Sequence, residues 1–241
     1  SSMCLMDKTS NFLDDADAPA KDYYDLIIVL GGDNSFTYVS NYVSNYWSSD
    51  IPILGVNSDP ERSVGCLTRW AINDDQDVFD MVEMLDFGEF DIKSWTRLGA
   101  TVDGKLITPA TSEYFFGERM RKNISRHILV YKGVEHEQKC SGIIFSTGAG
   151  STGWYHSATR GDTWGAEERI ARFVTTEPYN APMMCGEIEE GEEIILYSLN
   201  DDEGMVSVDS WEEEPFTRGS EARIHLGEPL NIVTPRKSQD G

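Results

Sequence analysis

The stretch IIVLGGDNSFTYV, Ile27–Val39, decides the fold of the first part of the chain. Four apolar residues lead directly into Gly31-Gly32-Asp33, and apolar side chains then recur at helical spacing through residues 35–47. A short apolar run that stops at glycine is typical of a fully buried strand in a parallel sheet. The sequence therefore predicts a strand, a tight glycine turn and a helix in immediate succession.

The same pattern follows once more along the chain. Residues 51–57, IPILGVN, form a second apolar run containing glycine, and residues 74–90 again show helical spacing. Asp74 or Asp75 is placed to cap that helix. Its apolar face is expected to consist of Val78, Met81, Val82 and Leu85. Strands that alternate with helices predict an open α/β sheet, in which ligands bind beyond the carboxyl ends of the strands.

The second half of the chain changes to short apolar runs joined by glycine and acidic turns. Asp103-Gly104 between two alternating segments is a hairpin signal. We therefore expect an open α/β nucleotide-binding domain over residues 1–90 and a β-sandwich-like domain over residues 91–228. Residues 229–241 are expected to pack back on the first domain.

The charge of the chain disfavours several classes of partner. Its 241 residues carry 42 acidic and 20 basic side chains, a net charge of −22. Such an acidic chain is poorly suited to nucleic acid or to anionic membranes, both of which require basic surface. A bound nucleotide would then be held by backbone N–H groups, a helix N-terminus or a metal ion. No apolar run approaches the about 18 residues of a membrane span.

Cysteine usage and the N-terminus bear on the compartment. The four cysteines are far apart in sequence, which is unfavourable for a zinc site or a disulfide framework; they are Cys4, Cys66, Cys140 and Cys185. A signal peptide would show a basic segment followed by a long apolar segment, and the N-terminus shows neither in that order. We expect a reducing compartment, either a bacterial cytoplasm or a mitochondrial matrix.

Asp33 lies on the turn where chemistry is expected. Glycines let the backbone approach a ligand closely, and N–H groups at a helix N-terminus favour phosphate. A carboxylate at this position can accept a proton from a substrate hydroxyl, or hold Mg²⁺ that bridges phosphate oxygens. The alternative is that Asp33 only caps the helix that follows.

Three motifs in order resemble the NAD kinase family, in the form of the mitochondrial-type enzyme and its bacterial relatives. LGGDNSF at 30–36 resembles the G-G-D-G-T turn, which lipid and sugar kinases share. ILGVNSDPERSVGCL at 53–67 resembles the family's second glycine turn. KCSGIIFSTGAGSTGWYHSA at 139–158 resembles the T-P-T-G-S-T-A-Y segment. The resemblance covers about residues 25–235 and implies an NAD kinase-like fold.

The resemblance implies that Asp33 activates the ribose 2′-hydroxyl of NAD. The phosphate and ATP contacts that it implies are Gly31, Gly32, Asn34, Ser35, Asn57 and Arg62. Asn34 and Ser35 depart from the family's glycine and threonine. Ser35 keeps a hydroxyl, and asparagine tolerates positive φ better than other non-glycine residues.

On the NAD side, the family's Asn-Glu pair falls at Ser112-Glu113, and the aspartate before its third motif falls at Ser141. The implied NAD contacts are Ser112, Glu113, Ser141, Thr152, Gly153, Trp154 and Ser157, with Asp59, Thr147 and Asp209 as further candidates. Trp154 replaces a tyrosine that stacks on adenine in the family, and an indole offers at least as large a ring face.

Several of these residues have a structural alternative. Trp154 is equally explained as a packed core tryptophan, and Thr152 and Ser157 as helix caps. Glu113 is equally explained as an exposed strand residue. Asn57 and Asp59 have the alternative of shaping an Asx-turn.

The implied function is transfer of a phosphoryl group from ATP or a similar donor to the 2′-hydroxyl of NAD(H), giving NADP(H). Mg²⁺ would be held mainly by the nucleotide phosphates, with Asp33 as a candidate ligand. The alternatives are a catalytically weak or inactive dinucleotide-binding or sensing protein, and a related lipid or sugar kinase. A homodimer or homotetramer is expected. Because the first buried strand begins earlier than in the family, the nucleotide domain is expected to be N-terminally short.

Overall fold

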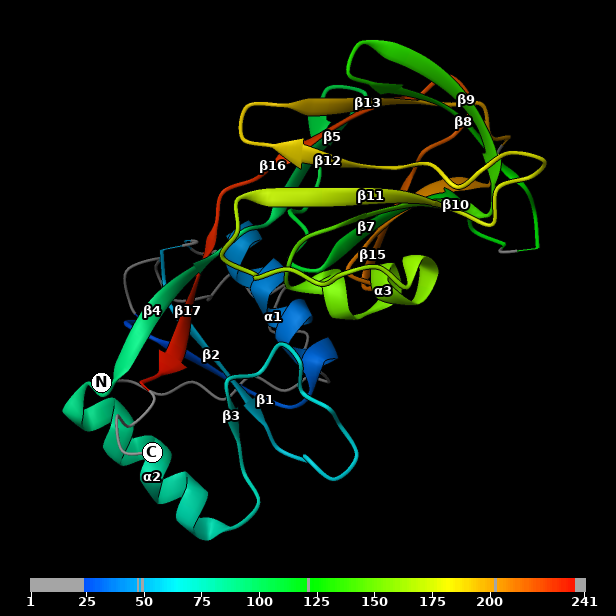
Figure 1. The fold of residues 1–241 in the computed structure, drawn as a ribbon. Coiled ribbons are helices and arrows are strands. Elements are labelled where there is room, and N and C mark those ends of the chain that lie inside the picture. The colour runs from blue at the N-terminus through cyan, green and yellow to red at the C-terminus, as the bar shows by residue number, and fades with distance from the viewer. Residues whose placement is uncertain (1–23, 47, 49, 121, 202, 237–241) are drawn as a thin grey trace. The chain divides into compact units, whose positions relative to one another are not determined.

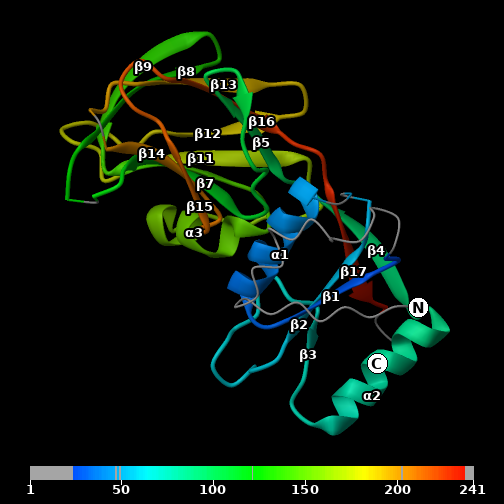
Figure 2. The ribbon, with the colours of Figure 1, turned by 180° about the vertical axis from the view of Figure 1, so that it is seen from behind.

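The computed structural model describes residues 24–46, 48, 50–120, 122–201 and 203–236. These residues form two compact units, one that ends at Trp95 and resumes at Leu230, and one that comprises Thr96–Pro229. Figures 1 and 2 show the ribbon from opposite sides. Trp47, the last residue of the helix expected over residues 35–47, lies outside the described residues.

The first unit is built on an open sheet with the strand order β1-β2-β17-β4, and β3 pairs with β2. Its strands are β1 (Ile27–Leu30), β2 (Ile53–Asn57), β3 (Trp70–Ala71), β4 (Phe90–Trp95) and β17 (Leu230–Pro235). β1 and β2 run parallel, whereas β4 and β17 run antiparallel to each other. The predicted α/β class of this part of the chain is confirmed.

Two helices of this unit, α1 (Asp33–Tyr46) and α2 (Asp75–Phe87), cover opposite faces of the sheet. Side chains alternate between the two faces along β2. A Cβ atom on Gly55 would lie 2.7 Å from the Phe36 ring of α1. Its neighbours along the strand face the other way, into a cluster of Leu54, Val56, Met81, Met84 and Val233 that includes α2. Both views show the sheet between the two helices (Figures 1 and 2).

The expectation that the first strand is fully buried is wrong. Ile27 and Val29 are buried, but Leu30 is 50% exposed. β1 is therefore covered on one face more than on the other, because among the described residues it is an edge strand paired only with β2.

The predicted apolar face of α2 is also partly wrong. Met81 and Met84 are buried, whereas Val78 and Val82 are exposed. The helix is rotated relative to the expected face because two long methionine side chains fill the space above the sheet. The capping prediction is correct for Asp74, whose carboxylate accepts hydrogen bonds from the first turn of the helix.

The second unit is a sandwich of two six-stranded, open sheets, which confirms the predicted β-sandwich-like class. One sheet has the order β12-β11-β10-β7-β14-β15 and the other β6-β5-β16-β13-β8-β9. The strands are β5 (Leu98–Val102), β6 (Lys105–Leu106), β7 (Glu113–Glu118), β8 (Ser125–Tyr131), β9 (Val134–Cys140), β10 (Gly142–Ser146), β11 (Ile170–Thr176), β12 (Cys185–Glu189), β13 (Glu193–Ser198), β14 (Gly204–Val208), β15 (Glu212–Pro215) and β16 (Glu221–Leu226).

Inward-facing side chains of both sheets meet in one core that contains Tyr114, Phe116, Phe145, Phe173, Leu129 and Leu196. The Asp103-Gly104 hairpin between β5 and β6 forms as predicted, with both residues at positive φ. On the outer face of the first sheet, α3 (Trp154–Thr159) follows the short 3₁₀ helix η2 (Gly150–Thr152). Tyr155 of α3 packs with Phe115, Ile144 and Val174 of that face.

Two further features follow from the described residues. No helix in this part of the chain combines the length and the apolar composition that a membrane crossing requires. Cys66, Cys140 and Cys185 are free thiols.

His127 on β8 is a fully buried polar residue that the sequence did not single out. Its Nε2 lies 3.0 Å from Nδ2 of Asn200, and its ring stacks on Phe216. Its Nδ1 has no hydrogen-bond partner. Burial lowers the pKa of His127 from 6.5 to about 3, because the charged form would lose its hydration.

We predict that His127 makes the protein sensitive to acid. Its pKa in the folded state lies below that in the unfolded chain, so its contribution is complete above pH 6.5 and is lost as the pH falls toward 3. The free energy of unfolding, measured by urea denaturation between pH 7 and pH 4, should fall less steeply in His127→Gln than in the wild type. His136→Gln, on the neighbouring strand β9, is the control. Equal slopes in the wild type and His127→Gln would contradict the prediction.

Candidate functional site

A first candidate site lies in the first unit, at the carboxyl ends of β1 and β2. These parallel strands are in register, with Leu30 opposite Val56, so the glycine turns that follow them lie side by side. The N–H of Gly31 donates to the carbonyl of Val56 at 2.9 Å and fixes the first turn to the second strand. This edge of a parallel sheet is where α/β proteins bind ligands.

Gly31 and Gly32 are required by close packing in the first turn. Gly31 has φ +148°, and a Cβ atom there would collide with the hydroxyl of Ser35. A Cβ atom on Gly32 would lie 2.7 Å from the hydroxyl of Ser63 on the second turn. A side chain at Gly31 would therefore collide with Ser35 of the same turn, and a side chain at Gly32 would displace Ser63 of the second turn.

Asp33 joins the two turns. Its carboxylate accepts a hydrogen bond from the N–H of Cys66 at 3.0 Å and from the N–H of Leu67 at 2.8 Å. Asp33 is the first residue of α1, and its carboxylate is bonded to this distant turn instead of to the N–H groups of its own helix. The alternative that Asp33 is only a helix cap is therefore wrong.

Asn34, the departure from the family's glycine, is compatible with the turn. It is the second residue of α1 and is exposed, and it is not among the described residues with positive φ. The conformational freedom of glycine is not needed at this position, because the positive φ is at Gly31. The substitution therefore imposes no backbone strain on the turn.

The second turn is built around Asn57, which is buried. Its Nδ2 donates to the carbonyl of Ser63 at 2.9 Å, and its Oδ1 accepts from the N–H of Asp59 at 3.1 Å. The contact between Asn57 Oδ1 and the N–H of Asp59 is the Asx-turn that the sequence offered as the structural alternative for these two residues. Arg62 is exposed and forms only a long ion pair of 3.7 Å with Asp59, so its guanidinium is accessible to an anion.

A second candidate site, in the other unit, is a turn at residues 111–113. The Ser112 hydroxyl donates to Glu113 Oε2 at 2.5 Å. Asp209 accepts hydrogen bonds from the N–H groups of Thr111, Ser112 and Glu113, each at 2.8 Å. Glu113 is half-buried at the start of β7, so the alternative that it is simply an exposed strand residue is wrong.

The carboxyl group of Glu113 is a weaker acid than usual. Burial raises its pKa to about 7, the negative charge of Asp209 adds to the rise, and the Ser112 hydroxyl opposes it. A carboxyl group with a pKa near neutrality exchanges protons under physiological conditions. Glu113 can therefore either donate or accept a hydrogen bond toward a ligand.

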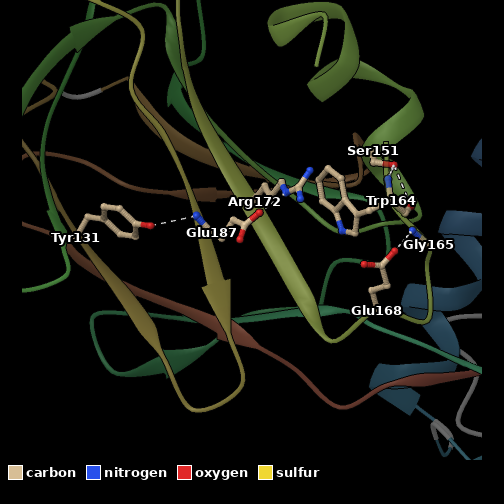
Figure 3. A network of polar contacts seen from close by, with 7 residues as sticks. All are labelled: Tyr131, Ser151, Trp164, Gly165, Glu168, Arg172 and Glu187. Carbon is tan, nitrogen blue, oxygen red and sulfur yellow. Dashed lines mark hydrogen bonds and ion pairs between the residues drawn. The ribbon is translucent and has the colours of Figure 1, made fainter. Parts of the chain in front are cut away.

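The glycine-rich turn at 148–153 is bonded through its own Ser151 to the segment that begins at Trp164 (Figure 3). Ser151 Oγ donates to the carbonyl of Gly148 at 2.7 Å and to that of Trp164 at 3.3 Å. A Cβ atom on Gly148 would collide with the carbonyl of Gly165. The turn is thus in direct backbone contact with the 164–165 segment.

A chain of contacts extends this support across the sheet (Figure 3). The guanidinium of Arg172 lies over the Trp164 ring, 4.5 Å from its centre, and donates to Glu187 at 2.8 Å. The N–H of Glu187 donates to the Tyr131 hydroxyl, and Glu168 accepts from the N–H of Gly165 at 2.7 Å. Trp164 is consequently fixed on the sheet, and the glycine-rich turn with it.

The residues beyond this turn are accessible. Thr152, Gly153 and Ser157 are exposed. Gly153 precedes α3 without any side-chain cap, so the alternative that Thr152 and Ser157 cap the helix is wrong. Trp154 is half-buried and stacks on Phe115 with ring centres 4.8 Å apart, as in its packing alternative.

Ser141 does not lie with the other NAD-side candidates. It precedes β10, whereas Ser146 at the other end of that strand is opposite Glu113. Five residues of extended chain separate these positions by about 17 Å. The Ser141 hydroxyl instead donates to Glu177 at 2.5 Å.

The described residues contain no group of three or more histidine, cysteine, aspartate or glutamate side chains placed to hold a metal ion. Asp33 is the carboxylate nearest to the phosphate turn, since it lies within that turn.

Comparison with known proteins identifies relatives. No protein-family model matches the chain. An NAD kinase from Methanosphaera stadtmanae is 27% identical over 134 residues, which is 56% of this chain and 46% of the relative. An NAD kinase from Methanothermobacter thermautotrophicus is 29% identical over 134 residues, 56% of this chain and 44% of the relative. The predicted resemblance to the NAD kinase family is confirmed.

The chain spans about half the length of these two NAD kinases. A longer match, to an NAD kinase from Francisella tularensis subsp. tularensis, is 26% identical over 193 residues, 77% of this chain and 62% of the relative. This match therefore covers about three quarters of the chain.

Solved structures show the same fold. An NAD kinase from Archaeoglobus fulgidus in complex with ATP matches with a TM-score of 0.72 at 20% identity, over 92% of this chain and 83% of that one. A yeast NADH kinase complexed with NADH matches with a TM-score of 0.73 at 16% identity, over 90% of this chain and 63% of that one. The chain has the NAD kinase fold.

Several residues that build the site were missed from the sequence. They are Ser63, Gly65, Cys66 and Leu67 on the second turn, and Trp164, Gly165 and Glu168 behind the glycine-rich turn. Most of them act through backbone groups, which leave no side-chain pattern. Gly65, at φ +65° and packed against Asn57, was the available signal.

We predict that Gly148→Ala destabilises the second unit, because its methyl group would collide with the carbonyl of Gly165. Overpacking of this kind costs about 1–3 kcal/mol. Urea denaturation should detect the loss. Gly153→Ala, whose methyl group would lie 3.5 Å from the nearest carbonyl, is the matched control in the same turn. Equal stability of the two variants would show that the 148–165 contact does not constrain the turn.

Proposed function

We propose that the protein is an NAD kinase, which transfers a phosphoryl group from ATP or a similar donor to the 2′-hydroxyl of NAD(H) and yields NADP(H). The sequence similarity to NAD kinases and the shared fold support this proposal. The observation that carries it is the position of Asp33, on a phosphate-type turn with its carboxylate bonded to a second glycine turn.

The first unit would bind the phosphates. The N–H of Gly32 and the N-terminus of α1 favour anions, while the N–H of Gly31 is bonded to Val56 and holds the turn in place. Asn34, Ser35, Asn57 and Arg62 belong to the same turns. The net charge of −22 makes these local donors necessary, because the chain as a whole repels phosphate. Mg²⁺ would neutralise part of the phosphate charge and would be held mainly by the nucleotide, with Asp33 as the candidate protein ligand.

Asp33 would act as the base. The ribose 2′-oxygen forms the new bond to the γ-phosphorus while the bond from that phosphorus to the leaving ADP oxygen breaks, and the hydroxyl proton passes to the Asp33 carboxylate. Its two hydrogen bonds to backbone N–H groups hold the carboxylate in one orientation before substrate arrives. This kind of positioning is the main means by which proteins accelerate phosphoryl transfer.

The second unit would bind NAD. Ser112 and Glu113 would contact the adenosine, with the exposed Thr152, Gly153 and Ser157 along the glycine-rich turn. Trp154, which is half-buried, would offer adenine the exposed part of its ring. Thr147 and Asp209 would support these contacts, and Asp59 is a further candidate on the Asn57 turn of the first unit.

Ser141 would contact NAD at a part of the dinucleotide about 17 Å from Glu113, or in a second subunit. A homodimer or homotetramer is the proposed assembly. A bacterial cytoplasm or a mitochondrial matrix is the proposed compartment.

NADP formation from NAD, ATP and Mg²⁺ tests the function. We predict that the wild type forms NADP and that Asp33→Asn lowers kcat by about 10²–10⁴-fold, the usual contribution of a general base. Asp80→Asn, on the exposed face of α2, is the matched control and should retain the wild-type rate.

NADP formation by Asp33→Asn at the wild-type rate would remove Asp33 from the chemistry. Wild-type protein that binds NAD and forms no NADP would favour the alternative of a dinucleotide-binding or sensing protein. ATP consumption that depends on an added lipid or sugar would favour the related kinases.

A further inference from the structure

Asp209 makes three hydrogen bonds to a segment that is nearly a hundred residues away in sequence. Its Oδ1 accepts from the N–H groups of Ser112 and Glu113, and its Oδ2 accepts from the N–H of Thr111, all at 2.8 Å. The N–H of Asp209 in turn donates to the carbonyl of Glu113 at 3.0 Å. The loop between β14 and β15 and the 111–113 turn are thus bonded in both directions.

The side chain of Asp209 is inaccessible to a ligand. The residue is 4% exposed, and both carboxylate oxygens accept hydrogen bonds from backbone N–H groups. Asp33 also accepts two such bonds but is only half-buried, so burial is what separates Asp209 from it. Asp209 therefore acts on the site through the turn that it holds.

Thr147 holds the same turn from its carbonyl side. Its hydroxyl donates to the carbonyl of Thr111 at 2.6 Å and accepts from the N–H of Gly150 at 3.2 Å. Its N–H donates to the carbonyl of Ser112 at 3.0 Å. The hydroxyl of Thr147 consequently connects the 111–113 turn to the glycine-rich turn.

We propose that Asp209 and Thr147 are positioning residues of the nucleotide site, which together fix the 111–113 turn and so aim Glu113 and the glycine-rich turn at one ligand. The inference rests on the proposed function, because that function assigns NAD to these two turns. It changes the role expected of both residues, from ligand contacts to a clamp on the backbone.

The clamp also sets the charge at Glu113. Burial and the charge of Asp209 together raise the pKa of Glu113 to about 7. The other charged and titratable groups around Asp209 are Arg97, Tyr114 and Glu212. Arg97 is buried and donates to the carbonyl of Glu228 at 2.8 Å, and the Tyr114 hydroxyl donates to the carbonyl of Thr108 at 2.7 Å. Loss of the Asp209 charge should therefore lower the pKa of Glu113.

Asp209→Asn tests the proposal. Asparagine has a similar shape and tolerates the φ of +48° at this position. It keeps one oxygen as an acceptor, carries no charge and turns an NH₂ group toward one backbone N–H. We expect the Kd for NAD, measured by calorimetry, to rise about tenfold or more. In the same variant the pKa of the Glu113 carboxyl, measured by ¹³C NMR, should fall, and amide hydrogen exchange at residues 111–113 should accelerate.

Asp103→Asn is the matched control. Asp103 is also an aspartate at positive φ whose carboxylate accepts from a distant backbone N–H, that of Glu221 at 2.8 Å. It belongs to the β5–β6 hairpin, so all three measurements should stay at wild-type values. Thr147→Val removes the other half of the clamp without removing a charge. It should weaken NAD binding and leave the pKa of Glu113 near its wild-type value, and it tests the clamp if Asp209→Asn does not fold.

The outcomes separate the inference from the function. Wild-type protein that neither binds NAD nor forms NADP would contradict the proposed function. Wild-type binding of NAD that is unchanged in Asp209→Asn or in Thr147→Val would overturn the positioning role. An unchanged pKa of Glu113 in a folded Asp209→Asn variant would overturn the electrostatic part.

Discussion

A carboxylate that accepts hydrogen bonds from the backbone N–H groups of a distant turn is the interaction on which both candidate sites depend. Asp33 makes it with the 66–67 turn, and Asp209 makes it with the 111–113 turn. Hydrogen bonds from N–H groups to an ionised acceptor are stronger than neutral ones. They also fix the direction of the acceptor. Each turn is therefore held in place without any large side chain of its own.

This construction suits a strongly acidic protein. With a net charge of −22, the chain offers few cations to a phosphate or to its own carboxylates. Backbone N–H groups carry partial positive charge, and they can be directed by the fold. The Gly31-Gly32 turn presents such groups at the N-terminus of α1, and the two aspartates are themselves stabilised by such groups. Backbone N–H groups stabilise these aspartates, and the same kind of group would stabilise a bound anion.

The glycines and serines of the turns show how packing limits variation. Gly32 faces the hydroxyl of Ser63, and Gly148 faces the carbonyl of Gly165. A side chain at either position would separate two turns. Asn34, by contrast, lies exposed on α1, where the family's glycine is not needed. Departure from a motif is therefore tolerated where the backbone is helical and excluded where two backbones touch.

The sequence by itself determined the strand–turn–helix succession, the Asp103-Gly104 hairpin and the family resemblance. These features follow from apolar periodicity and from local turn chemistry, which act over a few residues. The sequence did not determine that Leu30 is exposed or that Met84 replaces Val82 on the buried face of α2, because burial depends on which elements pack together.

Only the tertiary structure decided what the candidate residues do. Asp33 bonds to a turn 33 and 34 residues away, Asp209 to a turn 96 to 98 residues away, and Ser141 lies at the opposite end of β10 from Glu113's partner. The partners are backbone N–H groups, which every residue except proline carries. A pattern of side chains in the sequence therefore cannot predict which N–H groups are the partners. Their roles appear only when the chain has brought the turns together.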